Sequence, residues 1–146
     1  MNRTIVLALD GSEGADRAIP IAIQLASRDG ANIIVAHART RALETAIDAH
    51  LEAQIQKLRT AGVESEVVKA ASIDGREADV IAKVAHDRDA DMIVIAGRGR
   101  SPFVGATLGS VTYRLMHLAA CPVLVVPPGD TAMQPIEPDA VAATGR

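Results

Sequence analysis

Short apolar runs alternate with longer amphipathic stretches along most of this chain. Five of the runs are rich in aliphatic residues and bounded by turn residues, which is typical of buried β-strands. They span residues 5–9, 32–38, 64–70, 92–96 and 123–126. The third run alternates polar and apolar residues, which favours the edge of a sheet. The stretches between the runs predict helices over residues 13–28, 41–61, 74–87 and 110–119.

Local signals suggest how these helices begin and end. Pro20 falls inside the first predicted helix and is expected to kink it or to remove one hydrogen bond. Gly30 follows the same helix and is expected to end it. Asp74 and Glu77 have the spacing of a capping box, so Asp74 is the predicted N-cap of the third helix.

The alternation of strands and helices predicts an α/β domain with a parallel sheet, because right-handed crossovers through helices join parallel strands. The aliphatic core residues suit strands that are covered by helices on both faces. The 146 residues fit one domain, which we expect over residues 1–127. After Val126, prolines interrupt a polar, alanine-rich stretch. Residues 128–146 are therefore predicted to form a flexible C-terminal tail.

Charge and cysteine content argue against several classes of protein. The net charge is −3 and the aromatic residues are one Phe and one Tyr, whereas nucleic-acid-binding domains show a basic face or aromatic stacking platforms. One cysteine, Cys121, excludes an intramolecular disulfide framework. The sequence contains no signal-peptide pattern and no membrane-spanning run. We therefore expect a cytoplasmic protein that binds neither nucleic acid nor membranes.

Glycines gather in the loop after the fourth predicted strand, at positions 97, 99, 105 and 109. Glycines let a ligand approach the main chain closely, and the N–H groups and dipole of a helix N-terminus attract an anion. The last helix is expected to begin directly after Gly109. The alternative is that the glycines only permit a tight path between strand and helix.

A phosphate site is predicted from residues in or directly after this loop. The candidate contacts are Arg98, Gly99, Gly109, Ser110, Val111 and Thr112. The arginine would supply positive charge and the last two residues backbone N–H groups of the first helical turn, although loop arginines are often simply solvated. No P-loop motif is present, and the four histidines lie far apart in sequence, so no metal site built by the protein is predicted.

The loop resembles the nucleotide-binding loop of the universal stress protein family, whose ATP-binding members carry G-x2-G-x9-G-[ST]. Aligned on Gly109 and Ser110, the second glycine is Gly99 and the first falls on Ala96, so this chain reads A-x2-G-x9-G-S. The resemblance runs from Ile5 to Val126 and includes the segments ALDGSE, AHA and CPVLVV. Ala96 departs from the pattern, and its methyl group would lie close to a ligand on the strand end.

The resemblance implies a doubly wound, five-stranded parallel sheet with the order 3-2-1-4-5, counted along the chain. The first and fourth strands then end at a topological switch point, where ligands of open α/β sheets bind. It places Asp10 against the adenine or ribose of a bound ATP, which Mg²⁺ would accompany, and Ala38 against the base. The alternatives are a turn-holding role for Asp10 and simple packing for Ala38. It also implies a homodimer paired through the strand Val123 to Val126, an apolar edge that proteins usually cover.

These features together favour an adenine-nucleotide-binding module of stress response or signalling that acts as a dimer on a protein partner not identified by the sequence. One alternative is a nucleotide-free dimeric interaction module, which Ala96 favours. Another is a weak ATP hydrolase or autophosphorylating enzyme, although no nucleophile or acid–base pair can be assembled from the sequence. His37 is predicted to have a hydrogen-bonded structural role.

Overall fold

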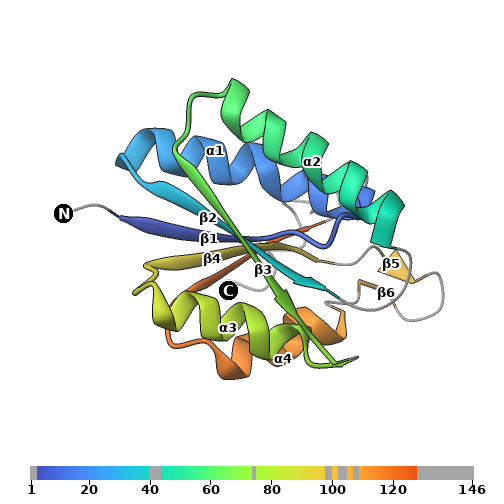
Figure 1. Ribbon diagram of the computed structural model, residues 1–146. Coiled ribbons are helices and arrows are strands. Elements are labelled where there is room, and N and C mark those ends of the chain that lie inside the picture. Colours follow the sequence, from blue (N-terminus) through green and yellow to red (C-terminus); the bar gives the residue numbers. More distant parts are fainter. Residues whose placement is uncertain are drawn as a thin grey trace, which may run out of the picture.

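Two layers of helices enclose a five-stranded β-sheet in the computed structural model, which describes residues 3–39, 44–73, 75–97, 100–101, 105–106 and 109–127. Helices α1 (Ala18–Asp29) and α2 (Glu44–Thr60) cover one face of the sheet, and α3 (Glu77–Asp87) and α4 (Ser110–Leu118) cover the other (Figure 1). The strands of the sheet are β1 (Thr4–Ala8), β2 (Asn32–Arg39), β3 (Ser65–Ala71), β4 (Met92–Ala96) and β7 (Val123–Val126). A 3₁₀ helix, η1 (Glu13–Arg17), precedes α1, and the short strands β5 (Arg100–Ser101) and β6 (Gly105–Ala106) pair antiparallel between β4 and α4.

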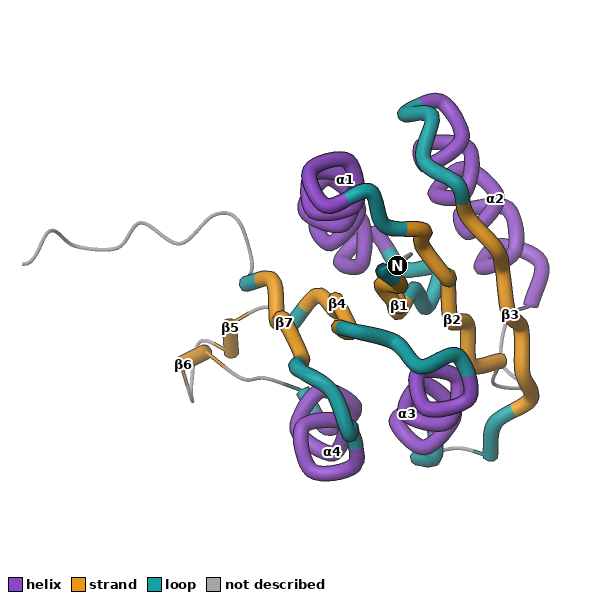
Figure 2. Tube along the Cα trace, turned by 90° about the vertical axis from the view of Figure 1, so that its left-hand side faces the viewer, coloured by secondary structure: helices purple, strands orange, loops and turns teal. Residues whose placement is uncertain are grey.

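The strands lie in the order β3-β2-β1-β4-β7, and each neighbouring pair is parallel. Figure 2 shows β3 and β7 at the two edges of the sheet. Because β7 is the fifth strand of this sheet along the chain, the predicted order 3-2-1-4-5 is confirmed. The edge position predicted for the third strand is confirmed as well.

Alternate residues of β1 divide the core between the two faces of the sheet. Ile5 and Leu7 belong to the buried cluster under α1 and α2, whereas Val6 and Ala8 belong to the cluster packed against α3 and α4. Successive side chains of a strand point to opposite faces, so a strand covered on both sides must be apolar throughout. This explains why the first strand reads as a continuous apolar run.

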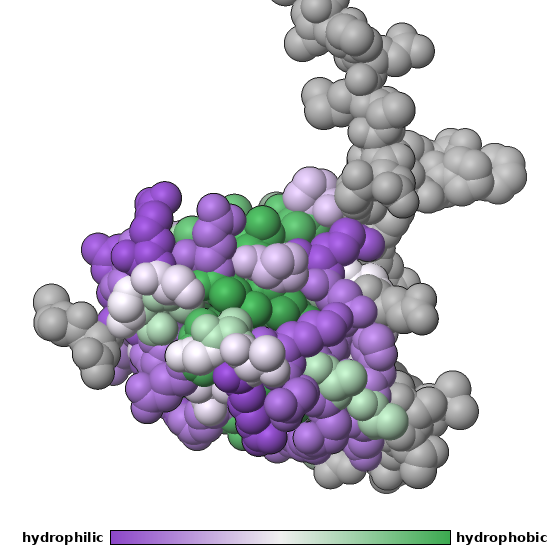
Figure 3. Space-filling model, turned by 90° about the horizontal axis from the view of Figure 1, so that it is seen from above, coloured by the Kyte–Doolittle hydropathy of each residue, from purple (hydrophilic) through white to green (hydrophobic). Residues whose placement is uncertain are grey.

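The two helices on this face of the sheet, α1 and α2, are amphipathic. In α1 the buried residues Ala18, Ala22 and Ala26 recur every four positions and face the sheet. Small alanines let the helix lie close to the strands beneath it. Seen from the side of these helices, polar residues cover much of the surface, with hydrophobic residues visible between them (Figure 3).

The prediction of one helix over residues 13–28 with a proline in its interior is wrong. Residues 13–17 form η1, and α1 begins at Ala18, so Pro20 is the third residue of α1. The first four N–H groups of a helix have no partner within it, and Pro20 therefore removes no hydrogen bond of α1. At the other end the prediction is confirmed: Gly30 is the C-cap, in the left-handed region with φ 65° and ψ 33°.

The predicted capping box is also wrong. Helix α3 begins at Glu77, its N-cap is Arg76, and no side chain caps it. Glu77 is thus the first residue of the helix rather than the third. Its carboxylate still lies near the positive end of the helix dipole, which is favourable. Asp74 lies outside the described residues.

Three further predictions concern residues that the structure does not describe. Residues 41–43, the start of the predicted second helix, lie outside the described part of the chain, and α2 begins there at Glu44. Residues 128–146 also lie outside it, so the domain boundary and the flexible tail stay predictions.

The pairing of β5 with β6 was not expected from the glycine-rich sequence. Among the described helices, none combines the length and the apolar character that crossing a membrane needs.

Candidate functional site

A cavity of about 370 Å³ opens beyond the carboxyl ends of β1 and β4, and we call it the crevice. The chain leaves β1 toward α1 on one face of the sheet and leaves β4 toward α4 on the other (Figure 2). This is the switch point of the doubly wound sheet, where ligands of such folds bind. The volume falls in the range of about 300–1,000 Å³ typical of small-molecule sites. The crevice is lined by Ala8, Leu9, Asp10, Ser12, Gly14, Ala15, Arg17, Ala36, Ala38, Glu77, Ile81, Ile95, Ala96, Gly97, Gly109, Val111 and Thr112.

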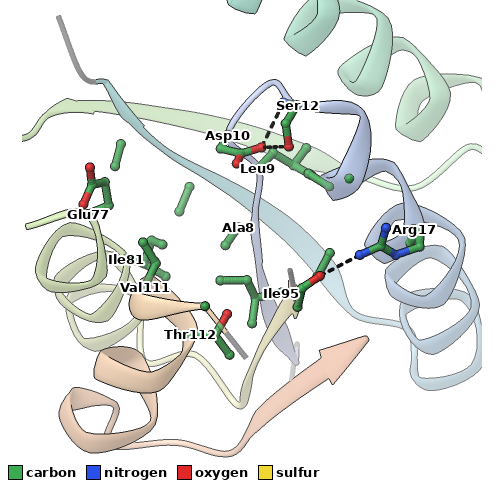
Figure 4. Close-up of a pocket in the computed structure, with 17 residues that line it drawn as sticks. Ala8, Leu9, Asp10, Ser12, Arg17, Glu77, Ile81, Ile95, Val111 and Thr112 are labelled. Carbon is green, nitrogen blue, oxygen red and sulfur yellow. Dashed lines mark hydrogen bonds between the residues drawn. The ribbon is translucent and has the colours of Figure 1, made fainter. Parts of the chain in front are cut away.

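Alanines at the ends of three strands make room for the crevice. Ala8 ends β1, Ala36 and Ala38 lie in the last half of β2, and Ala96 ends β4. Each contributes only a methyl group, so space remains above the strand ends. Branched aliphatic side chains from α3, β4 and α4 complete the apolar part of the lining (Figure 4). An apolar slot with a few polar groups at its margin suits a flat organic ring.

Asp10 and Ser12 form a tight turn at the margin of the crevice. The Asp10 carboxylate oxygen Oδ1 accepts hydrogen bonds from the backbone N–H of Ser12 at 2.9 Å and from its hydroxyl at 2.5 Å (Figure 4). Gly11 between them has φ 79°, a left-handed conformation that favours glycine. The turn-holding role of Asp10 is thus observed. Its contact with a ligand stays a prediction.

His37 fixes the end of β1 from the neighbouring strand. It is 4% exposed, and its Nδ1 lies 2.8 Å from the carbonyl oxygen of Leu9. Since a carbonyl oxygen only accepts, Nδ1 carries the proton and donates. The Leu9 N–H in turn donates to the Ala36 carbonyl at 3.1 Å. The predicted structural role of His37 is confirmed, and its effect is to hold the strand that positions Asp10.

A second set of contacts holds the segment after this turn. Gln54 of α2 is fully buried and its Nε2 donates to Asp16 Oδ1 at 2.6 Å and to the Ser12 carbonyl at 3.2 Å. His50 donates from Nε2 to the same carboxylate at 3.1 Å. Partial burial alone would raise the pKa of Asp16, but the hydrogen bonds from Gln54 and His50 lower it below the ordinary value of 3.8. Asp16 therefore stays ionised and ties η1 to α2.

The first turn of α4 forms the wall of the crevice opposite η1. Gly109 is its N-cap, with φ 81° and ψ 152°, and no side chain caps the helix. The N–H groups of the first turn have no partner within the helix. Val111 and the buried Thr112 both line the crevice. The positive end of the helix dipole and these free N–H groups make this wall a favourable place for an anion.

Ser110 differs from the other predicted residues of this helix start. It is the first residue of α4, it is exposed, and it is not part of the lining. Its contact with a phosphate stays a prediction.

Arg17 enters the crevice from the last position of η1. Its Nη2 donates to the carbonyl oxygen of Gly97 at 2.6 Å (Figure 4). Its Nε is buried, and no hydrogen-bond partner for it is found among the described residues. Sequence reasoning missed Arg17, because a single arginine at a helix start is usually a solvated residue and no motif marks it.

Of the nine residues predicted to bind a ligand, the structure brings six together around the crevice: Asp10, Ala38, Ala96, Gly109, Val111 and Thr112. Arg98 and Gly99 lie outside the described residues. The lining residues that the sequence did not indicate include three with polar side chains, namely Ser12, Arg17 and Glu77. The sequence pattern marks Glu77 only as part of a helix start. Ser12 follows a strand end and Glu77 begins a helix, so a search of such positions would have included both, whereas no local signal marks Arg17.

The sequence of the whole domain places this site in a known group of proteins. A universal stress protein of Thermus aquaticus is 32% identical to this chain over 138 residues, which cover 86% of this chain and 99% of that protein. A model of the universal stress protein family matches residues 1–127. This chain belongs to the universal stress protein family.

Solved structures of universal stress proteins share the architecture. The crystal structure of one in complex with cAMP has a TM-score of 0.71 and 27% identity, and the match covers 88% of this chain and 98% of that one. A universal stress protein from Archaeoglobus fulgidus has a TM-score of 0.70 and 26% identity, with 86% and 98% covered. The observed fold is thus that of solved universal stress proteins.

Gly97 has a packing role in the glycine loop of this universal stress protein. A Cβ atom added there would lie 3.2 Å from Cγ1 of Val125 and 3.7 Å from the carbonyl oxygen of Val126. The Gly97 N–H donates to that same carbonyl at 2.9 Å. The glycine therefore lets β4 end against β7. Ala96, at the position of the family's first glycine, places its methyl group on the crevice.

Proposed function

We propose that this universal stress protein binds an adenine nucleotide, ATP in the cell, in the crevice, and that it acts as a dimer in cytoplasmic stress response or signalling. The observation that carries the proposal is the crevice itself, an apolar slot at the switch point with free N–H groups on one wall. The relative solved in complex with cAMP supports the adenine nucleotide as ligand class.

The two ends of the crevice suit the two parts of a nucleotide. The alanine-lined strand ends offer an apolar surface for a flat base, and Asp10 offers a carboxylate that accepts hydrogen bonds from a ribose hydroxyl or a base amino group. The first turn of α4, with Gly109, Val111 and Thr112, faces the phosphates. The residues present therefore fit an adenine nucleotide.

Mg²⁺ would come with the nucleotide. Among the described residues no group of three His, Cys, Asp or Glu side chains is placed to hold a metal ion. Oxygens of the phosphates would then supply most of the ligands, as is usual for Mg²⁺ in nucleotide sites.

Adding ATP is expected to stabilise the folded protein, because a ligand that binds only the folded state at 100 times its dissociation constant contributes about 2.7 kcal/mol. For a domain of this size that raises the melting temperature by several degrees, which a thermal-shift assay measures. ADP, AMP, cyclic AMP and GTP should be compared in the same assay. We expect the adenine nucleotides to act and GTP to act less.

The same assay separates the proposal from its alternatives. The Ala96→Gly variant restores the spacing of the family's loop, so a shift that appears only in this variant would make the wild type a nucleotide-free interaction module. Phosphate release from ATP that disappears on Gly109→Ala substitution would instead indicate a hydrolase. Absence of any shift at millimolar concentrations of every nucleotide would contradict the proposal.

The dimer is proposed to pair through β7, which lies at the edge of the sheet (Figure 2). The carbonyl oxygens of Pro122 and Val126 accept hydrogen bonds from Ile93 of β4 and from Gly97, which follows β4. Along a parallel strand, every second residue points its N–H and C=O groups toward one neighbouring strand, and the residues between them point these groups to the other side. Val123 and Val125 thus offer their backbone groups away from β4. An apolar edge with free backbone groups is a template for pairing with another strand.

Replacing Val125 by proline is expected to convert the dimer to a monomer. The proline removes an N–H group that points away from β4, so the ladder between β4 and β7 stays intact while the pairing between protomers loses a hydrogen bond and meets the proline ring. Sedimentation velocity at micromolar concentration measures the change, and circular dichroism checks the fold. A monomeric wild type, or a variant that stays dimeric, would count against pairing through β7.

A further inference from the structure

We propose that Arg17 binds a phosphate group of the nucleotide, so that the crevice selects nucleotides over the corresponding nucleosides. This inference rests on the proposed function and adds a residue from η1, outside the glycine loop, to the site. Its starting point is that Arg17 is a charged side chain inside a cavity of mainly apolar lining. The question is which group balances this charge.

The guanidinium of Arg17 reaches across the end of the sheet. Arg17 follows β1 in the chain and Gly97 follows β4, yet Nη2 donates to the Gly97 carbonyl at 2.6 Å. This contact ties the guanidinium to the segment that follows β4 (Figure 4). It uses one of the five N–H donors that an arginine carries. No partner for the other four is found among the described residues.

The buried Nε of Arg17 has no hydrogen-bond partner among the described residues. Buried donors are nearly always paired in folded proteins, and an exception calls for a missing partner. Other arginines of this chain lie on carboxylates: Arg88 donates to both carboxylate oxygens of Glu66, and Arg114 donates to both of Asp79. Within the described part of the chain, Arg17 forms no such ion pair.

Space for an anion lies beside the guanidinium. A Cβ atom added to Gly14 would lie 3.8 Å from the hydroxyl oxygen of Ser12 and 4.0 Å from Nη1 of Arg17. Glycine at position 14 therefore leaves open the place between a hydroxyl and a cation. The opposite wall of the crevice carries the free N–H groups of α4. A phosphate between the two walls would receive donors from both sides, and arginine suits phosphate through paired N–H donors.

The acidic groups of the crevice give the ligand a direction. Oδ1 of Asp10 is already engaged by Ser12, and Glu77 lies across the crevice from Arg17 (Figure 4). A carboxylate repels a phosphate and accepts hydrogen bonds from amino groups. The anionic part of the ligand is thus placed toward Arg17 and the base toward Glu77.

Comparing AMP with adenosine tests this role, because the two ligands differ only in the phosphate. Isothermal titration calorimetry on the full chain should show that Arg17→Met weakens AMP binding by roughly 10- to 100-fold, the size expected for losing hydrogen bonds to a charged group. Adenosine binding should change less than about two-fold. Arg17→Lys keeps the charge but loses the paired donors, so its loss for AMP should be intermediate.

Arg28→Met is the matched control, since it removes the same charge from the exposed end of α1, where the side chain is 78% exposed. It should leave both affinities unchanged. Equal losses of AMP and adenosine in Arg17→Met would make Arg17 a structural residue and overturn the inference, as would unchanged AMP binding. A wild type that binds AMP and adenosine equally would overturn it while the proposed function stands. A wild type that binds neither ligand, nor ATP, would overturn both.

Discussion

Replacing Gly109 by alanine is expected to weaken nucleotide binding on the order of 100-fold or more, the largest loss we expect from one small substitution in this protein. Gly109 has φ 81° and ψ 152°, a region that is nearly exclusive to glycine and strained by roughly 1–3 kcal/mol for other residues. Alanine would relieve the strain by turning the start of α4. The N–H groups proposed to bind the phosphates would then change direction, and each hydrogen bond to a charged group is worth about 1.5–3 kcal/mol. Isothermal titration calorimetry with ATP measures the loss.

Gly30→Ala provides the control for backbone strain. Gly30 also has a positive φ, 65°, and nothing lies within 4 Å of an added Cβ atom. Its substitution should cost stability of about 1–2 kcal/mol, because an alanine is forced into a left-handed conformation, and should leave the affinity for ATP unchanged. If both variants lost affinity equally, the effect would come from general destabilisation. Wild-type affinity in Gly109→Ala would mean that α4 does not hold the ligand.

Replacing Leu115 by alanine should destabilise the protein by about 2–5 kcal/mol, the usual cost of truncating a fully buried leucine. Leu115 is 0% exposed and anchors α4 in the core cluster shared with α3 and the sheet. Urea denaturation followed by circular dichroism measures the free energy of unfolding. Since α4 also carries the wall proposed to bind the phosphates, a stability gain from ATP should shrink in this variant.

Leu118→Ala is the matched control on the same helix. Leu118 is 43% exposed, so it loses less contact on truncation, and surface substitutions usually change stability by about 0.5 kcal/mol or less. Equal destabilisation by the two variants would mean that the packing of α4 is not as described. A loss below about 1 kcal/mol for Leu115→Ala would contradict its burial.

The fold was predictable because its signals are local and repeated. The apolar runs at residues 92–96 and 123–126 match β4 and β7 residue for residue. In β4 the run is uninterrupted because the strand is covered on both faces. The strand order needed the family resemblance, because patterning alone does not say which strands are neighbours. The errors fell at helix starts. Pro20 and Glu77 each carried a plausible local signal, but helices α1 and α3 begin a few residues later than predicted.

The site was predictable where it lies on the main chain and not where it depends on a long-range side-chain contact. Asp10 and Gly109 follow strands whose ends the sheet brings together, so their proximity follows from topology. Arg17 meets Gly97 across 80 positions of sequence. Nothing in the residues around Arg17 distinguishes it from a solvated charge. For Ser110 the loop pattern marks the position but not the direction of the side chain, so its contact with a ligand stays a prediction.

Gly97 takes part in two surfaces at once. Its carbonyl oxygen receives the guanidinium of Arg17, its N–H holds the carbonyl of Val126, and the side of its Cα faces Val125 on the outermost strand. One residue thus joins the mouth of the cavity to the rim of the sheet. A side chain at position 97 would therefore disturb both regions together.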